Sequence, residues 1–168
     1  MSGVIVRPAE VADEKFLWAM LFEAAYSREQ GMTSPDELRA VPELARYVEG
    51  WGVAGDLGVI AEEDGVLLGA AWARMFTREN AAYGYVDDAT PEIAIAVAPE
   101  GRGAGLGTQL MTGLLDAMRP VYDSVSLSVR RENPALRLYE RLGFVEVPDT
   151  DHGNRAGTVS VTMVLRFR

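Results

Sequence analysis

The sequence contains no cysteine and a single histidine, His152. Disulfide bonds, a thiolate nucleophile and thiolate metal sites are therefore excluded, and a histidine-based triad or metal centre has no partner residues. The chain also lacks a run of about 18 apolar residues that could span a bilayer, and its first residues lack the basic region and apolar core of a secretory signal. We therefore expect a cytoplasmic protein that binds neither a metal nor a membrane.

Positive charge is scarce as well. The formal net charge is −9 at pH 7, which argues against a nucleic-acid partner, because a broad surface for phosphates needs a basic stripe. Five arginines nevertheless gather in one part of the chain, at Arg102, Arg130, Arg131, Arg137 and Arg141. Their grouping predicts a local seat for an anionic ligand, although solvated surface arginines would give the same pattern.

The length of 168 residues fits one domain, residues 1–168, because the chain shows no linker, repeat or low-complexity tract. Short apolar runs bounded by turn residues predict strands. These runs lie at 4–7, 57–63, 66–76, 92–97, 125–129, 144–147 and 158–167. Asp64-Gly65 joins the second and third runs and predicts a two-residue hairpin, whereas the polar stretch 77–91 predicts a loop.

Four segments carry apolar residues at helical spacing. The first begins near Asp13, a possible cap. The second begins at Ser34-Pro35-Asp36-Glu37, where a capping serine precedes a proline in the first turn, and it is expected to end near Gly50. The other two begin near Gly105 and Ala135. Helices interleaved with strands predict an α/β (α+β) fold, a mixed sheet flanked by helices.

One strand is unusual because its two faces differ in side-chain size. Ser124, Ser126 and Ser128 point to one face of the predicted strand 125–129, opposite its apolar residues. Small side chains leave room for something to lie on that face, although a plain amphipathic edge strand would have the same pattern.

The run Val97-Ala98-Pro99-Glu100-Gly101-Arg102-Gly103-Ala104-Gly105-Leu106-Gly107 joins a predicted strand to a predicted helix. Its four glycines let backbone N–H groups close around phosphate oxygens, and the helix that begins near Gly105 directs its positive dipole end to the same place. The run therefore predicts a pyrophosphate site, although a glycine-rich turn would look alike. It is neither a dinucleotide fingerprint nor a P-loop, because the third glycine of one and the lysine of the other are missing.

What does fit is the pattern Arg-x-x-Gly-x-Gly at residues 102–107, which resembles the coenzyme A pyrophosphate motif of the GNAT N-acetyltransferase superfamily. A second segment, Asn-Pro-Ala-Leu-Arg-Leu-Tyr-Glu-Arg-Leu-Gly-Phe at residues 133–144, is similar to another motif of that superfamily. The resemblance covers roughly residues 59–147. It implies a mixed, mostly antiparallel sheet in which two splayed strands, 93–97 and 125–129, hold acyl-CoA.

The resemblance also implies the residues that bind the cofactor, acetyl-CoA. Those expected to hold its pyrophosphate are Arg102, Gly103, Ala104, Gly105, Leu106 and Gly107, with a hydroxyl contact from Thr108. Backbone groups of Val97 and Ala98 are expected to receive the pantetheine arm and to polarise the thioester carbonyl. Asn133 matches a residue that contacts this arm, but as an asparagine before proline it also fits a helix cap.

Two residues are expected to carry the chemistry. Tyr139 matches the general acid of the superfamily, and a phenol with a pKa of about 10 is a reasonable proton donor to a thiolate whose conjugate acid lies near about 8.5. Its alternative role is an aromatic at the edge of the core. Glu92 stands where many relatives carry a general base, with Asp87 and Asp88 as the other local carboxylates. Each of these acids is otherwise a solvated charge.

The expected function is transfer of an acetyl group from acetyl-CoA to the primary amine of a small molecule. The loop 77–91 and the helices between Tyr26 and Tyr47 are placed to close a pocket, which would favour a small acceptor. The alternatives are acetylation of a protein N-terminus or lysine, which needs an open groove, and a non-catalytic coenzyme A-binding module. A homodimer is a further possibility, because the strand 158–167 can pair within the chain or with a partner.

Overall fold

The computed structural model describes residues 3–168, and within them eight strands form one sheet. The strands are β1 (Ile5–Pro8), β2 (Leu57–Glu63), β3 (Val66–Arg74), β4 (Glu92–Val97), β5 (Ser124–Arg130), β6 (Val145–Glu146), β7 (His152–Gly153) and β8 (Val159–Arg166). Their order is β1-β2-β3-β4-β5-β8-β6, with β7 paired to β8. Only β4 and β5 are parallel, which confirms the mixed, mostly antiparallel sheet.

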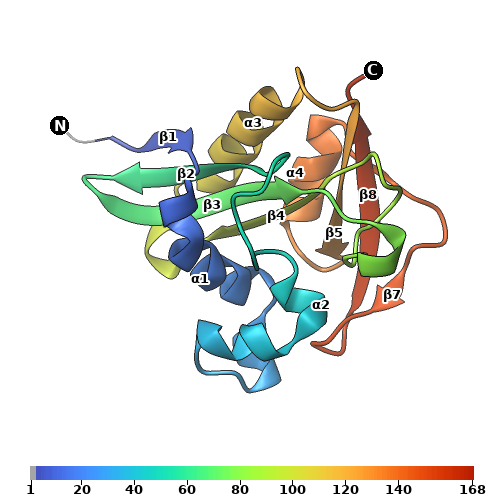
Figure 1. The fold of residues 1–168 in the computed structure, drawn as a ribbon, viewed down its shortest axis with the longest axis horizontal. Coiled ribbons are helices and arrows are strands. Elements are labelled where there is room, and N and C mark those ends of the chain that lie inside the picture. The colour runs from blue at the N-terminus through green and yellow to red at the C-terminus, as the bar shows by residue number, and fades with distance from the viewer. Residues whose placement is uncertain (1–2) are drawn as a thin grey trace.

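Helices cover both faces of this sheet (Figure 1). The α-helices are α1 (Glu14–Ala24), α2 (Pro42–Ala45), α3 (Leu106–Met118) and α4 (Ala135–Leu142). Leu110, Leu114 and Met118 of α3 are fully buried in a core that includes residues of α4. On the opposite face, Leu17 of α1 and Trp72 of β3 belong to a second core. The sheet therefore lies between two apolar layers, as an α/β arrangement requires.

Several expected elements are confirmed. Strand β4 has the predicted bounds, and α3 follows Gly105 directly. The hairpin between β2 and β3 turns at Asp64 and Gly65, which both have positive φ, at 52° and 80°. Such a turn matches the right-handed twist of the two strands. Trp18, Trp51 and Trp72 are buried packing residues, and the loop 77–91 contains one short 3-10 helix, Arg78–Asn80.

The second predicted helix is wrong in its extent. Ser34 caps it as expected, with its Oγ accepting a hydrogen bond from the Asp36 N–H at 3.3 Å. The segment is however a 3-10 helix, Pro35–Ala40, followed by the short α2. Pro42 explains the break, because it has no N–H to donate to the preceding turn and holds Val41 in an extended conformation.

Asp13 precedes α1 but does not cap it. Its carboxylate instead accepts two hydrogen bonds from the Arg7 guanidinium, at 2.9 and 3.0 Å, and one from the Glu10 N–H at 2.7 Å. The ion pair lowers the pKa of Asp13. The runs predicted to be strands do not include β7, which pairs with β8. Strand β8 thus pairs with β5 and also with β6 and β7 of its own chain.

The face of β5 that carries small side chains is covered by the chain itself. Ser126 is fully buried, and its Oγ donates to the Gly84 carbonyl at 2.8 Å. The hydroxyls of Ser124 and Thr90 lie 2.8 Å apart. The loop 77–91 therefore packs on this face. The room left by the serines is filled at Ser124 and Ser126, and only Ser128 borders open space.

Candidate active site

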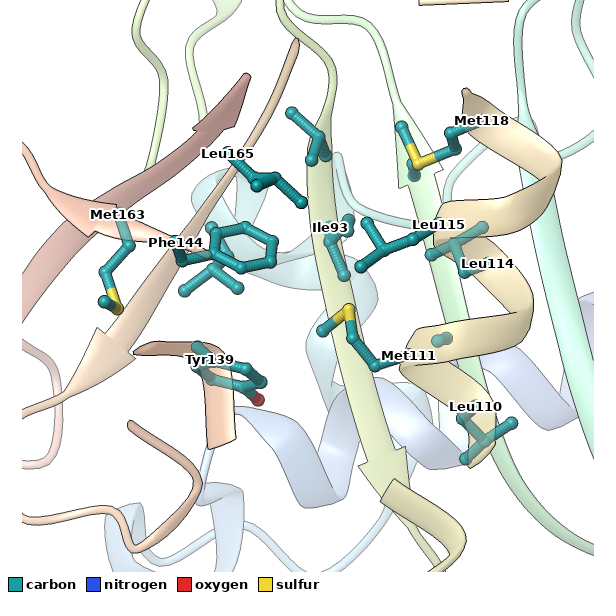
Figure 2. Packing of buried hydrophobic residues seen from close by; sticks show 14 of the residues in the cluster. Ile93, Leu110, Met111, Leu114, Leu115, Met118, Tyr139, Phe144, Met163 and Leu165 are labelled. Carbon is teal, nitrogen blue, oxygen red and sulfur yellow. The ribbon is translucent and has the colours of Figure 1, made fainter. Parts of the chain in front are cut away.

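Strands β4 and β5 pair only at the beginning of β4. The register joins Glu92 to Ser126 and Ile93 to Leu127, and no further residue of β4 pairs with β5. Figure 2 shows the two strands diverging beyond Ile93. The residues 94–97 are partly exposed although they lie in the middle of the sheet. The predicted splay of these two strands is therefore present.

The open half of β4 presents backbone donors to this gap. The Ala98 N–H donates to the Leu68 carbonyl of β3 at 2.8 Å. Residues of an antiparallel strand alternate in the direction of their hydrogen bonds, so Ala94 and Ala96 bond to β3 as well. The N–H groups of Ile95 and Val97 consequently face the gap.

This alternation distinguishes the two residues that were predicted to offer backbone groups to the cofactor. Val97 directs its N–H into the gap, where it can meet a ligand. Ala98 uses its N–H on Leu68 and its carbonyl on the Gly101 N–H. Ile95, which the sequence analysis did not select, is a better donor than Ala98 for this reason.

A cavity of about 150 Å³ occupies the gap and extends to both faces of the sheet. Tyr139 comes from the core on the α3 face and Tyr47 from the core on the α1 face, and both line the cavity. The aromatic and charged residues of its walls are Tyr26, Tyr47, Tyr83, Glu92, Arg130, Tyr139, His152 and Arg155. The cavity thus connects the two layers of the fold through the sheet.

Glu92 is a buried wall of this cavity, with 2% of its surface exposed, and not a solvated charge. Its Oε2 accepts a hydrogen bond from the Tyr47 hydroxyl at 2.5 Å, and its Oε1 accepts one from the Gly84 N–H at 2.9 Å. Burial raises the pKa of Glu92 to about 7, while both hydrogen bonds oppose the rise. A carboxyl group with this pKa can accept and release a proton near neutral pH.

Gly84 holds the loop 77–91 directly against Glu92. A Cβ at this position would lie 2.7 Å from the backbone carbon of Leu127 and 3.0 Å from the carboxyl carbon of Glu92. Only glycine allows this approach, so Gly84 both donates to Glu92 and lets the loop seal β5. Asp87 and Asp88, by contrast, are exposed and do not line the cavity.

Tyr139 enters the cavity from α4. Its ring packs against Phe144, with centroids 5.9 Å apart, and Figure 2 shows its hydroxyl directed toward β4. Burial, with a smaller contribution from Tyr26, raises the pKa of Tyr139 above its ordinary value. The hydroxyl makes no hydrogen bond to any of residues 3–168 and stays protonated, so its proton is available to a ligand in the gap.

The glycine-rich segment leads from β4 to α3. Gly103 and Gly105 have φ values of 84° and 74°, which side chains disfavour. No side chain caps α3 at Gly105, so the first-turn N–H groups at 106–108 have no side-chain cap among residues 3–168. Thr108 is exposed beside them, whereas the Leu106 side chain lies in the core and offers only its backbone. An anion fits here.

Two further candidates have partners within the protein. Arg102 is exposed beside the glycines and donates to Glu23 of α1 at 3.0 Å. Asn133 accepts the Ala135 N–H at 2.9 Å, as a cap of α4 would, and donates to the Tyr26 hydroxyl at 3.1 Å. The capping role of Asn133 is thus present, and its amide also fixes one wall of the cavity.

Sequence reasoning missed several residues of the cavity. Tyr47 lies 45 positions before Glu92, and no local pattern links them. His152 belongs to none of the sequence motifs, yet its ring stacks on Tyr83 with centroids 6.0 Å apart and lines the cavity. Only the grouping of tyrosines in the predicted walls pointed to Tyr26, Tyr47 and Tyr83.

Comparison with known proteins decides the family. The profile of the acetyltransferase (GNAT) family matches residues 18–144, most of the chain. The chain belongs to the acetyltransferase (GNAT) family. The match includes β4, β5, the glycine-rich segment and Tyr139, whereas the cavity walls from His152 to Ser160 lie beyond it.

Individual GNAT relatives agree with this assignment. A mycothiol acetyltransferase of Thermomonospora curvata is 32% identical over 147 residues, which are 85% of this chain and 44% of that protein. The chain thus spans less than half the length of that relative. Among solved structures, the yncA protein of Salmonella typhimurium with its cofactor acetyl-CoA has a TM-score of 0.67 at 21% identity, covering 99% of this chain and 95% of its own.

A second solved GNAT structure is a chimera of the spermidine N-acetyltransferase SpeG from Vibrio cholerae with hSSAT. Its TM-score is 0.65 at 25% identity, and the match covers 98% of this chain and 95% of the other. Within residues 3–168 of the present GNAT protein, no group of three or more acidic or histidine side chains is arranged to hold a metal ion. No helix in this range is long and apolar enough to cross a membrane.

Proposed function

We propose that the protein transfers an acetyl group from acetyl-CoA to the primary amine of a small molecule. One observation carries this proposal: a single cavity joins the backbone of β4 as far as Ile95, the protonated Tyr139 and the buried Glu92 through a gap in the sheet. Membership of the GNAT family supports the donor, and the wall of Glu92 and tyrosines supports an amine acceptor.

The chain has two features that fit acetyl-CoA. The first turn of α3 offers backbone N–H groups for the pyrophosphate, and a Cβ at Gly103, Gly105 or Gly107 would meet none of residues 3–168 within 4 Å, so a ligand can approach. The unpaired edge of β4 suits an extended arm that forms hydrogen bonds like those of a strand. In this arrangement Arg102 exchanges its partner Glu23 for a phosphate oxygen.

Each reacting group has a role in the proposed mechanism. Acetyl-CoA supplies an activated acetyl group, whose C–S bond breaks as the C–N bond to the amine forms. Glu92 accepts the proton that the attacking amine loses. The N–H groups of Ile95 and Val97 lie about 7 Å apart along the strand, so one of them stabilises negative charge on the carbonyl oxygen, an effect typically worth about 3–4 kcal/mol, and the other bonds the pantetheine arm.

Tyr139 completes the proton balance by donating to the departing thiolate. Its raised pKa makes the phenol a weaker acid than in water. Burial, however, disfavours the thiolate in the same way and so raises the pKa of the thiol as well. Proton transfer from the phenol to the thiolate inside the cavity is therefore less unfavourable than the raised pKa of the phenol alone suggests. Glu92 gains one proton and Tyr139 loses one, and exchange with solvent restores both.

The walls of the cavity favour a small acceptor over a protein. Arg155, in the segment 154–158 between β7 and β8, donates to Gln30 at 2.9 Å and to Glu43 at 2.7 Å. These contacts tie the segment to the chain that follows α1 and to α2. A protein N-terminus or a lysine would need an open groove here. The retained Glu92 and Tyr139 argue against the other alternative, a module that binds coenzyme A without turnover.

Calorimetry with acetyl-CoA, followed by thiol release with a panel of amines, amino acids, polyamines and peptides, tests the proposal. We expect binding, and release that depends on a small amine. Binding without release for any amine would support the non-catalytic module, and release with peptides alone would support the protein acetyltransferase. Absence of binding would refute the whole proposal. A cytoplasmic location and a homodimer stay predictions, to be checked by fractionation and by sedimentation.

A further inference from the structure

The charges on the cavity wall restrict the acceptor. Glu92 is the only carboxylate of residues 3–168 that lines the cavity, whereas Arg130 and Arg155 both line it. Both oxygens of Glu92 already accept hydrogen bonds, from Tyr47 and Gly84. The cavity therefore offers a carboxylate to one amine, at Glu92. The other charged side chains of its walls are the two arginines.

Carboxylates near the cavity are held by these arginines. Arg130 pairs with Glu29 at 2.6 Å and with Glu132 at 3.2 Å, and Arg155 pairs with Glu43 at 2.7 Å. None of the three glutamates lines the cavity. Each of these glutamates pairs with a guanidinium group and is not available to an acetyl acceptor in the cavity.

The two arginines differ in their freedom. The Arg130 side chain is 9% exposed, stacks over the Tyr26 ring at 3.9 Å and donates to the Thr158 hydroxyl. The Arg155 side chain is 37% exposed at the mouth of the cavity, and its Nη2 makes no hydrogen bond to any of residues 3–168. Arg155 thus retains donors that an acceptor can use.

We infer that the acceptor carries a single ammonium group, with an uncharged polar or anionic group at its other end, and that Arg155 determines this preference. The inference rests on the proposed function. A second ammonium group would find no carboxylate on the cavity wall to accept its hydrogen bonds, because Glu29, Glu43 and Glu132 pair with the arginines, so its desolvation would be uncompensated. A carboxylate or hydroxyl group instead accepts hydrogen bonds from Arg155.

Three amines of matched length test the inference: 4-aminobutanoate, 4-amino-1-butanol and 1,4-diaminobutane. We expect kcat/KM for the diamine to be at least about tenfold below that of the amino alcohol, and that of 4-aminobutanoate to be equal or higher. Arg155→Gln should reduce both differences by several-fold, and Arg155→Lys should preserve their order. Arg168→Gln is the matched control, because Arg168 is also exposed and ion-paired, to Asp123 at 3.1 Å.

The outcomes separate this inference from the proposed function. A diamine acetylated as well as the amino alcohol, or a preference unchanged in Arg155→Gln, would overturn the inference and leave the acetyltransferase proposal standing. If no thiol is released with any of the three amines or with any other amine of the panel, both proposals are overturned. Thermal unfolding of each variant shows whether a change comes from lost folding.

Discussion

At Glu92 and Ile93, strand β4 pairs with β5 and is buried, whereas residues 94–97 lie beyond the last pair and remain partly exposed. Both halves pair with β3 without interruption. The first half is ordinary sheet. The second half is an edge inside the sheet, with donors that no strand uses.

An unpaired edge is normally a risk, because another strand can add to it. Here β5 moves away while remaining fully paired with β8 on its other side, and the gap is flanked by Tyr139 and Glu92. The difference between the halves shows how one strand can contribute both to folding and to ligand binding. The following changes should affect the two halves differently.

The largest effect is expected from Tyr139→Phe, which acts on the open half alone. Loss of the hydroxyl should lower kcat for acetyl transfer by about a hundredfold or more, because the thiolate leaves without a proton. Acetyl-CoA affinity, measured by calorimetry, should change little. An unchanged kcat would remove Tyr139 from the mechanism.

Proline substitutions compare neighbouring residues of β4. Val97→Pro removes an N–H that faces the gap and should lower kcat/KM by about a hundredfold in a protein that still folds. Ala96→Pro removes an N–H bonded to β3 and should destabilise the fold. The midpoint of unfolding in urea should therefore be lower for this variant. If Val97→Pro proved the less stable of the two, the assigned alternation would be wrong.

Gly105→Val tests the anion site next to the open half. A β-branched residue strains a φ of 74° and fills the open space over the first turn of α3 that the pyrophosphate would use, so acetyl-CoA should bind at least about tenfold more weakly, which is about 1.4 kcal/mol. Gly50→Val is the control, because Gly50 has a φ of 73° and open space around it within residues 3–168. Both variants should lose similar stability, and equal loss of affinity would contradict the site.

The smallest effect on catalysis is expected from a change at Glu92, where the paired half of β4 meets the open half. Tyr47→Phe removes a hydrogen bond that lowers the pKa of Glu92, so this pKa should rise further above about 7. Glu92 acts as a base only when deprotonated. The acid limb of the kcat/KM profile should therefore move to higher pH by about one unit. Tyr83→Phe, whose hydroxyl does not contact Glu92, should leave the limb in place.

Local patterns predicted the parts of the fold that depend on neighbours in sequence. The Asp64-Gly65 turn, strand β4 and the start of α3 all follow from short spacings. The predicted helix after Ser34 is wrong in extent because Pro42 interrupts it, and the Asp13 carboxylate pairs with Arg7, six residues earlier, and does not cap α1. Spacing alone does not show which of two neighbouring partners a carboxylate takes.

The candidate site also contains some residues that local motifs predict and others whose contacts depend on the packing of distant segments. Glu92 and Tyr139 were selected through motifs, and the structure brings both to one cavity. The hydrogen bond from Tyr47 and the close approach of Gly84 depend on how separate segments pack. The direction of the Val97 and Ala98 N–H groups depends on the register of β3. A single sequence without its pairing register gives neither.

The ion pair between Arg155 and Glu43 joins segments that are 112 residues apart, and the cavity walls run from Leu21 to Ser160. During synthesis, the first of these walls leaves the ribosome long before the last. Contacts so distant in sequence form late and slowly. A nascent chain from which β8 has not yet emerged would thus have no enclosed chamber, and its catalytic competence would begin only once β8 has left the ribosome.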